Sequence, residues 1–257
     1  MSQSSGLLVL TPQYTSTGAL LAQAAAGRGL EVEQLPPGRT VPGRRVPDRL
    51  RGLRPAHLYG GPEFAAAVAP QLGVTLVEPS PDWLPAVPRR FTGRTIHELP
   101  LSEARELPLP FFAKPPKDRV FAADVYSSGK RLPTDLPDTT PVQVSEIVTF
   151  TVEFRLFLLD GDIRTASRYA TYGRLDPAPL SWCAEETEVL RFTYDFLASH
   201  GPALPHACVL DVGLILATNG QPAQWAVVEA NMAWFSHIYA SDPERALDVV
   251  LSAAVSL

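Results

Sequence analysis

Three oxygen-bearing side chains interrupt two apolar runs between Ala207 and Trp234: Asp211 in the first run, and Glu229 and Asn231 at the end of the second. Residues two apart on a strand point to the same face, so Glu229 and Asn231 should lie together. Two carboxylates and an amide oxygen on one face suit Mg²⁺, which takes few protein ligands and completes its shell with substrate phosphates. A polar rim on a half-exposed sheet is the alternative.

Whether Asp211 joins that face depends on the turn at Thr218–Gln221, where Asn-Gly between apolar runs predicts a hairpin. A two-residue loop pairs Asp211 with Val228 and turns Glu229 to the opposite face. A three-residue loop, Asn219–Gln221, sets Asp211 across from Glu229. Hairpins of the longer kind are common, and a proline directly after the turn fits poorly inside a ladder. Two carboxylates so close should repel each other when no metal is bound.

Lysine is rare in this sequence and is concentrated in one segment. Of 22 lysine and arginine residues, only Lys114, Lys117 and Lys130 are lysine. A chain that otherwise uses arginine keeps a compact ammonium where a phosphate has to be contacted. Chance clustering of three residues is the alternative.

A second hairpin is predicted over Asp160-Gly161. Counting back from a two-residue loop sets Glu153 opposite Arg168 and places Arg155 on the same face. Such a face is either a solvated surface with cross-strand ion pairs or one wall of a cleft for a polyphosphate and a carboxylate.

The elements that position these residues follow from periodicity. Strands alternate with helices over residues 1–80, which predicts a small parallel α/β lobe. Residues 81–110 are rich in proline and should connect two lobes. From residue 111 the pattern becomes mostly strands, with an amphipathic helix over Glu186–His200 and a last helix that Asp242 caps.

Composition excludes several classes of protein. A net charge of −5 argues against a general nucleic-acid-binding face, and two cysteines are too few for a disulfide framework or zinc cluster. No apolar run is long enough for a membrane span, and the first ten residues lack the basic start of a signal peptide. These features predict a cytoplasmic protein with no nucleic-acid or membrane partner.

Four segments together resemble the ATP-grasp fold, in particular its small stand-alone members: FFAKPPKDRVFAADVY, VSEIVTFTVEFRLFLLDGDIRTASRY, VLDVG and WAVVEANMAW. The resemblance covers about residues 80–257. It implies an α/β and α+β fold in which residues 1–80 form an N-terminal parallel α/β lobe and residues 81–110 a connector. Residues 111–145 would form subdomain A and residues 146–257 subdomain B, with ATP between the two.

The same resemblance implies how ATP would be held. Lys114 resembles the strand lysine that contacts nucleotide phosphates, and Lys117 supplies charge in a loop that lacks the usual glycines. Three consecutive residues resemble the segment that recognises the adenine edge through backbone groups: Glu146, Ile147 and Val148.

It also implies roles for residues of subdomain B. Glu153 is similar to the acid that takes the ribose hydroxyls. Arg168 stands where a catalytic basic residue that contacts phosphate is expected, and Arg155 where phosphate or substrate would be bound. The magnesium ligands of the family resemble Asp211, Glu229 and Asn231.

The implied activity is an ATP- and Mg²⁺-dependent carboxylate–amine ligase that forms amide or peptide bonds through an acyl phosphate. Its partners would be small-molecule or peptide acids and amines, and a homodimer is left open. No Ser-His-Asp or Cys-His arrangement competes with this interpretation. The alternatives are a phosphotransferase acting on a non-carboxylate acceptor and a nucleotide-binding module without turnover.

Overall fold

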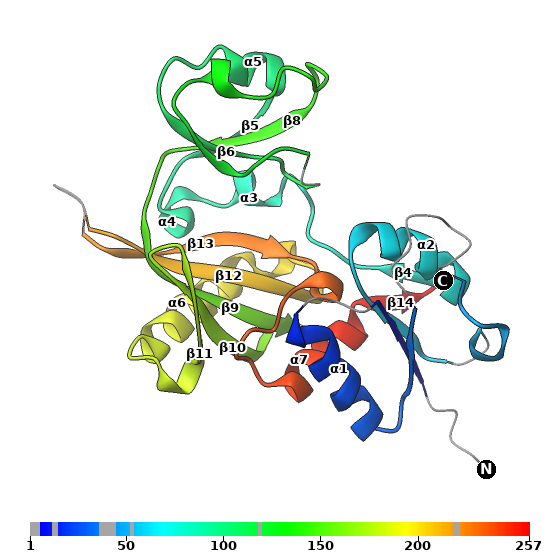
Figure 1. Cartoon of the computed structure of the whole chain (residues 1–257). Coiled ribbons are helices and arrows are strands. Elements are labelled where there is room, and N and C mark those ends of the chain that lie inside the picture. The colour runs from blue at the N-terminus through cyan, green and yellow to red at the C-terminus, as the bar shows by residue number, and fades with distance from the viewer. Residues whose placement is uncertain (1–5, 12–14, 36–44, 52–53, 118–119, 218–221) are drawn as a thin grey trace.

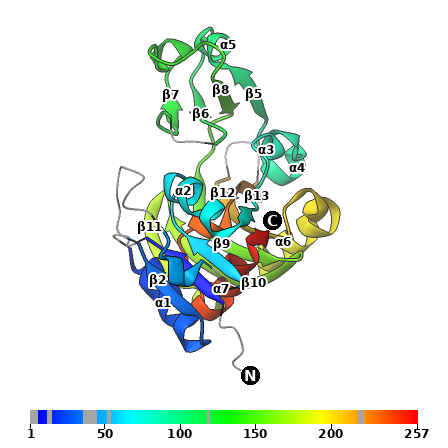
Figure 2. The same cartoon turned by 90° about the vertical axis from the view of Figure 1, so that its right-hand side faces the viewer.

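The computed structural model describes residues 6–11, 15–35, 45–51, 54–117, 120–217 and 222–257, which form three packed parts around four sheets. The predicted turn at 218–221 and part of the loop after Lys114 lie outside these residues. Figures 1 and 2 show the small sheet with β5, β6 and β8 standing apart at the top, above the large sheet that carries β9 to β13.

The N-terminal lobe is built on the fully buried strand β1, which pairs in parallel on both sides in the order β2-β1-β3. Its elements are β1 (Leu7–Leu10), α1 (Ser16–Gly27), β2 (Glu31–Gln34), β3 (Ala56–Tyr59), α2 (Pro62–Leu72) and β4 (Val74–Leu76). The last of these strands, β4, does not join this sheet, although a parallel lobe is predicted over residues 1–80. Instead, β4 pairs antiparallel with the last strand, β14 (Ala254–Ser256), so the C-terminal end of the described chain returns to the first lobe.

Subdomain A is a four-stranded antiparallel sheet of order β5-β8-β6-β7. Its elements are β5 (Ile96–Pro100), α5 (Leu101–Arg105), β6 (Phe111–Lys114), β7 (Asp124–Tyr126) and β8 (Pro141–Ser145). Residues 81–110 are therefore not merely a connector, because β5 and α5 belong to this sheet and its core. Of residues 81–110, the part that lies between the first lobe and subdomain A contains the short helices α3 (Trp83–Ala86) and α4 (Arg89–Thr92).

The large sheet has five antiparallel strands in the order β11-β10-β9-β12-β13. Its elements are β9 (Phe150–Leu159), β10 (Asp162–Thr171), β11 (Arg174–Pro179), α6 (Glu186–His200), β12 (Ala207–Ile215), β13 (Gln224–Asn231) and α7 (Pro243–Ser252). One face packs on α6 and α3, while α7 lies on the other face and contacts α1 of the first lobe. Both predicted helices are confirmed, and the Asp242 carboxylate caps α7 by accepting from the N–H groups of residues 244 and 245.

Short 3-10 helices complete the described elements: η2 (Asp48–Leu50), η3 (Gly129–Arg131), η4 (Leu180–Trp182), η5 (Gly201–Ala203) and η6 (Ala233–Phe235). The last of these, η6, follows β13 and contacts β3. The end of β13, which carries Glu229 and Asn231, therefore meets the first lobe.

Three of the register shifts in the ladders of the large sheet each leave one extra residue in a strand. In β10 the extra residues are Arg164 and Tyr169, and in β13 the extra residue is Val228. The two extra residues of β10 together move the register by two positions, so Glu153 lies opposite Ala170 instead of Arg168. The first of them, Arg164, reverses the side-chain alternation that follows it and so turns Arg168 to the other face. The predicted Glu153–Arg168 pairing is therefore wrong.

Candidate active site

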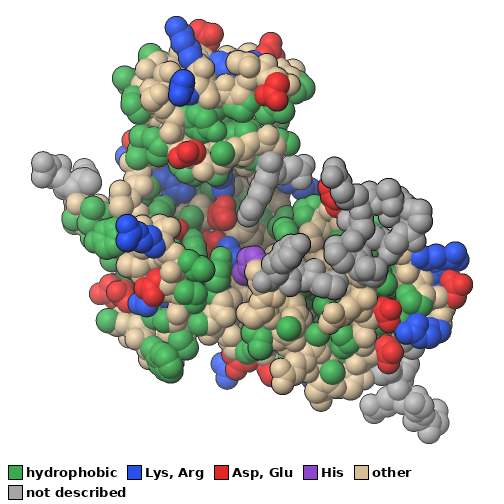
Figure 3. All heavy atoms as spheres, in the orientation of Figure 1, with side chains coloured by type: hydrophobic (Ala, Val, Ile, Leu, Met, Phe, Trp, Pro, Cys, Tyr) green, Lys and Arg blue, Asp and Glu red, His purple; other side chains and the backbone are tan. Residues whose placement is uncertain are grey.

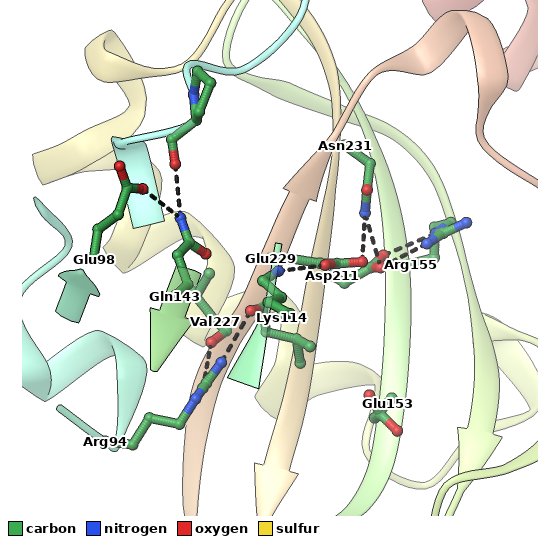
Figure 4. Close-up of polar contacts among 12 residues, drawn as sticks. Arg94, Glu98, Lys114, Gln143, Glu153, Arg155, Asp211, Val227, Glu229 and Asn231 are labelled. Atoms are coloured by element: carbon green, nitrogen blue, oxygen red, sulfur yellow. Dashed lines mark hydrogen bonds and ion pairs between the residues drawn. The ribbon is translucent and has the colours of Figure 1, made fainter. Parts of the chain in front are cut away.

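Charged side chains of both signs gather in the hollow between subdomain A and the large sheet (Figure 3). They come from strand β6 of subdomain A and from β9, β12 and β13 of the large sheet (Figure 4). The residues that could bind a phosphorylated ligand are therefore supplied by two separate sheets.

Asp211 is almost completely buried, and Arg155 on the neighbouring strand binds both of its oxygens. The guanidinium Nε donates to Oδ1 at 2.8 Å and Nη2 donates to Oδ2 at 2.6 Å. The two residues face each other directly across β9 and β12. Burial alone would lower the pKa of Arg155, but Asp211 raises it, so the guanidinium is charged at neutral pH.

Glu229 is held from the other side by the strand lysine of subdomain A. The Lys114 ammonium donates to Glu229 Oε2 at 2.7 Å and thereby joins the two sheets. Burial alone would raise the pKa of Glu229, but Lys114 and Asn231 lower it to about 2. The expected repulsion between the two carboxylates is thus offset by a cation on each of them.

Asn231 bridges the two carboxylates. Its amide nitrogen donates to Asp211 Oδ2 at 3.2 Å and to Glu229 Oε1 at 3.0 Å, so one side chain reaches both acids. Among the described residues, no three His, Cys, Asp or Glu side chains group as metal ligands. The donor set is therefore two carboxylates and one amide, which fits Mg²⁺ only where a nucleotide supplies the remaining oxygens.

The expected register at this site is confirmed, but its origin differs from the one proposed. Asp211 lies opposite Glu229, as the three-residue loop would give. Closer to the turn, Ile215 lies opposite Gln224, which is the register of the shorter loop. The extra residue Val228 changes one register into the other and thereby brings Glu229 to Asp211.

Glu153 shares the face of Arg155 and accepts a hydrogen bond from the hydroxyl of Tyr169 at 2.7 Å. Burial raises the pKa of Glu153, and this hydrogen bond opposes the rise. Arg155 lies near the rings of Tyr169 and Tyr239, at 5.4 and 5.1 Å from their centroids. Nothing in the pattern singles out the tyrosines, because Tyr169 shares this face only as a result of the extra residue Arg164 earlier in β10.

The linker between the two sheets contains the residues predicted to meet adenine. The Glu146 carboxylate accepts from the N–H of Thr95 at 2.8 Å and pairs with Arg89 at 3.1 Å. Ile147 is about half exposed, and neither it nor Val148 has a backbone hydrogen bond to the described part of the chain. Their backbone groups are accordingly available to a ligand, while the side chain of Glu146 is not.

Two further predicted residues lie away from this cluster. Arg168 faces the opposite side of the sheet, where it pairs with Asp176 on β11 at 2.9 Å. The predicted placement of Arg168 at the phosphates is therefore wrong. Lys117 forms an ion pair with Glu78, just after β4, and so joins the loop after β6 to the first lobe.

Residues 91–249 match the model of a protein family described as an ATP-grasp domain, the second family of its clade. The chain belongs to this family. The assignment confirms the predicted ATP-grasp fold and indicates an ATP-dependent ligase. A comparison with curated proteins found no match to this ATP-grasp chain.

Solved structures share the fold over nearly the whole chain. One is N5-carboxyaminoimidazole synthase from Aspergillus clavatus, with a TM-score of 0.57 and 13% identity over 97% of this chain and 77% of that one. D-alanine–D-alanine ligase from Bacillus anthracis has a TM-score of 0.54 and 12% identity, with coverage of 98% and 97%. A RimK domain ATP-grasp protein from Sphaerobacter thermophilus has a TM-score of 0.52 and 15% identity, with coverage of 96% and 100%. At such identities the likeness concerns the fold alone.

No helix in the described part of this ATP-grasp chain combines the length and apolar character that a bilayer crossing requires.

The buried ion pair predicts strong energetic coupling between its residues. Asp211→Asn and Arg155→Met should each lower the free energy of unfolding by about 3–5 kcal/mol, because each leaves an unpaired buried group. The double variant should cost at least about 1 kcal/mol less than the sum of the two. Urea unfolding measures the cycle, and the exposed pair Arg49–Glu33 is the control, with an expected coupling below about 1 kcal/mol. Additive losses at Arg155 and Asp211 would contradict the stabilising role of the pair.

The depressed pKa of Glu229 predicts a specific dependence of stability on pH. A carboxyl whose pKa is lower in the folded than in the unfolded state stabilises the fold above its unfolded pKa, about 4.3, and less as pH falls toward 2. The stability difference between the wild type and Glu229→Gln should therefore be constant above about pH 5 and shrink toward pH 2. Thermal unfolding over pH 2–7 tests this. In a Lys114→Met background the pH-dependent part should be smaller and should end at a higher pH, because the folded-state pKa of Glu229 is then less depressed.

Proposed function

We propose that this chain is an ATP- and Mg²⁺-dependent carboxylate–amine ligase. The observation that supports this most directly is the Lys114–Glu229 contact, which brings a phosphate-type lysine from one sheet to the carboxylate strand of the other. Positive and negative side chains then line the same hollow, as a triphosphate with its metal requires.

Each residue has a part in that arrangement. Lys114 contacts the nucleotide phosphates, and Lys117, in the loop after β6, would join it by exchanging Glu78 for a phosphate oxygen. The free backbone groups of Ile147 and Val148 meet the adenine edge, with Glu146 holding the linker in place.

On the large sheet, Glu153 receives the ribose hydroxyls. Arg155 lies next to the phosphate end and orients the transferred group or the acid substrate. The metal would be held by Asp211, Glu229 and Asn231, the last by its amide oxygen after a turn of the amide. Bound Mg²⁺ would neutralise phosphate charge as the γ-phosphoryl group is transferred.

The reaction proceeds in two steps. A carboxylate oxygen of the acid attacks the γ-phosphorus, the bond to the β-phosphate oxygen breaks, and ADP leaves. An amine then attacks the acyl carbon, inorganic phosphate leaves, and the amine loses its proton. The protein supplies charge and position and needs no covalent nucleophile.

Product analysis separates this function from its alternatives. With a mixture of amino acids and short peptides, a ligase releases ADP and inorganic phosphate in equal amounts, and hydroxylamine in place of the amine yields a hydroxamate. A phosphotransferase forms ADP while phosphate stays on the acceptor, and a binding module forms neither product. Absence of both ADP and phosphate release across such mixtures would contradict the proposal.

Lys114→Ala should weaken ATP binding about 10- to 100-fold, because a charge-assisted hydrogen bond contributes about 1.5–3 kcal/mol. Lys114→Arg should recover little, since a guanidinium is larger and differently hydrated. Lys130→Ala, at an exposed lysine of η3, is the matched control and should bind normally. Calorimetry measures the affinities. Unchanged binding in Lys114→Ala would remove this lysine from the nucleotide site.

Glu153→Gln should weaken ATP binding yet leave the protein as stable as the wild type or more so. Burial raises the pKa of Glu153, so its charge destabilises the fold as pH rises through that pKa. Any stability gain should accordingly be present at pH 7–8 and absent below about pH 4. Calorimetry and thermal unfolding check both parts. A large loss of stability with normal ATP affinity would instead mark the Glu153–Tyr169 hydrogen bond as structural.

A further inference from the structure

Arg94 is a buried guanidinium that lies beside β13, the strand that carries Glu229 and Asn231 (Figure 4). Its Nη1 donates to the carbonyl of Val227 and its Nη2 to the carbonyl of Val228, both at 3.0 Å. A third bond runs from Nη1 to the carbonyl of Thr92, also at 3.0 Å. Within the described part of the chain Arg94 has no carboxylate partner, so all of these bonds go to backbone oxygens.

These acceptors lie where the ladder of the large sheet is irregular. Counted from the turn, Val227 is the last residue of β13 that keeps the register of the shorter loop. Val228 is the extra residue, and beyond it the register is that of the longer loop. A bulge of this kind leaves backbone groups outside the regular ladder, and an unpaired buried carbonyl is costly. The forked guanidinium of Arg94 satisfies both carbonyls at once, which an ammonium cannot do in a fixed geometry.

The next residue toward the C-terminus is Glu229, whose position depends on that shift. Without the extra residue, Asp211 would face Val228 and the Glu229 carboxylate would point to the other side of the sheet. The bonds from Arg94 therefore hold the backbone in the conformation that sets Glu229 beside Asp211.

The segment that carries Arg94 is itself fixed on both sides. Gly93 has φ +65° and packs so closely that an added Cβ would lie 2.4 Å from Ile215 Cδ1. Thr95 donates its N–H to Glu146 in the linker and is followed directly by β5, the first strand of subdomain A. Arg94 thus connects the start of subdomain A to the bulge of the large sheet.

The positive charge of Arg94 also favours a position of Glu229 close to it. Burial lowers its pKa to about 10, and Glu229 and Glu153 oppose this change, so the group is cationic at neutral pH. A ring of Phe150 lies 5.4 Å from the guanidinium carbon and shields it on one side.

We propose that Arg94 is a positioning residue for metal binding: it fixes the β13 bulge that aims Glu229 at Asp211, and it ties that bulge to subdomain A. This inference rests on the proposed Mg²⁺-dependent nucleotide site. It assigns a function to a residue that touches neither the nucleotide nor the metal.

The test compares Arg94→Met and Arg94→Lys with Arg105→Met. Arg105 is the control because its guanidinium also donates to backbone carbonyls, those of Pro133 and Leu136, but within subdomain A. Unlike Arg94, it also pairs with a carboxylate, that of Asp138. Amide hydrogen exchange of residues 227–229, without nucleotide or metal, reports the bulge. Calorimetry of ADP binding over a Mg²⁺ titration reports the metal site.

In Arg94→Met, exchange at residues 227–229 should accelerate, and apparent Mg²⁺ affinity in the presence of ADP should fall about 10- to 100-fold, as for other groups that orient ligands. Metal-free ADP binding should change much less. Arg94→Lys should lie between the wild type and Arg94→Met, and Arg105→Met should match the wild type in both measurements. If Arg94→Met does not fold, Arg94→Lys carries the same two comparisons.

Unchanged exchange at the bulge in the Arg94 variants would overturn the inference, as would normal Mg²⁺ affinity despite a loosened bulge. Equal losses in Arg105→Met would also overturn it, since they would reflect a general loss of stability. If the wild type itself shows no Mg²⁺-dependent ADP binding, the proposed function fails, whereas the exchange data still decide whether Arg94 holds the bulge.

Discussion

Asp211 is a carboxylate buried inside a five-stranded sheet, and its charge is tolerated there because Arg155 binds both of its oxygens. That pair decides how the neighbouring groups are arranged. Glu229 can lie close by because the ammonium of Lys114, from the other sheet, neutralises its charge. The amide nitrogen of Asn231 lies between the two acids and donates to both. The site therefore carries its own counter-charges, and a metal–nucleotide complex would exchange partners with them without bringing charge into an apolar cavity.

For the proposed function, this arrangement would make the contact between the two sheets part of nucleotide binding. Lys114 belongs to subdomain A and Glu229 to the large sheet, so their ion pair exists only when the two sheets are close. Lys117 joins the loop after β6 to Glu78 of the first lobe. Glu146, in the linker between β8 and β9, accepts a hydrogen bond from the N–H of Thr95. Phosphates entering the hollow would compete for both lysines, which links nucleotide binding to the relative position of three parts of the chain.

Much of the fold could be predicted because it depends on local patterns. The helix at 186–200, the cap at Asp242 and most strands follow from periodicity and turn residues. The small sheet was only partly predictable, because β5 and α5 lie in a proline-rich segment that resembles a linker. The pairing of β4 with β14 joins residues about 180 positions apart, and no local pattern indicates it.

The candidate site shows where counting from a turn succeeds and where it fails. Residues two apart, such as Glu229 and Asn231, share a face whatever the loop does, so their grouping was predictable. Pairings across a hairpin are different, because one extra residue reverses every later side chain. Such a residue places Tyr169, not Arg168, beside Glu153, and another brings Glu229 to Asp211. Bulges are stabilised by distant groups, here the guanidinium of Arg94, and the strand sequence alone does not encode them.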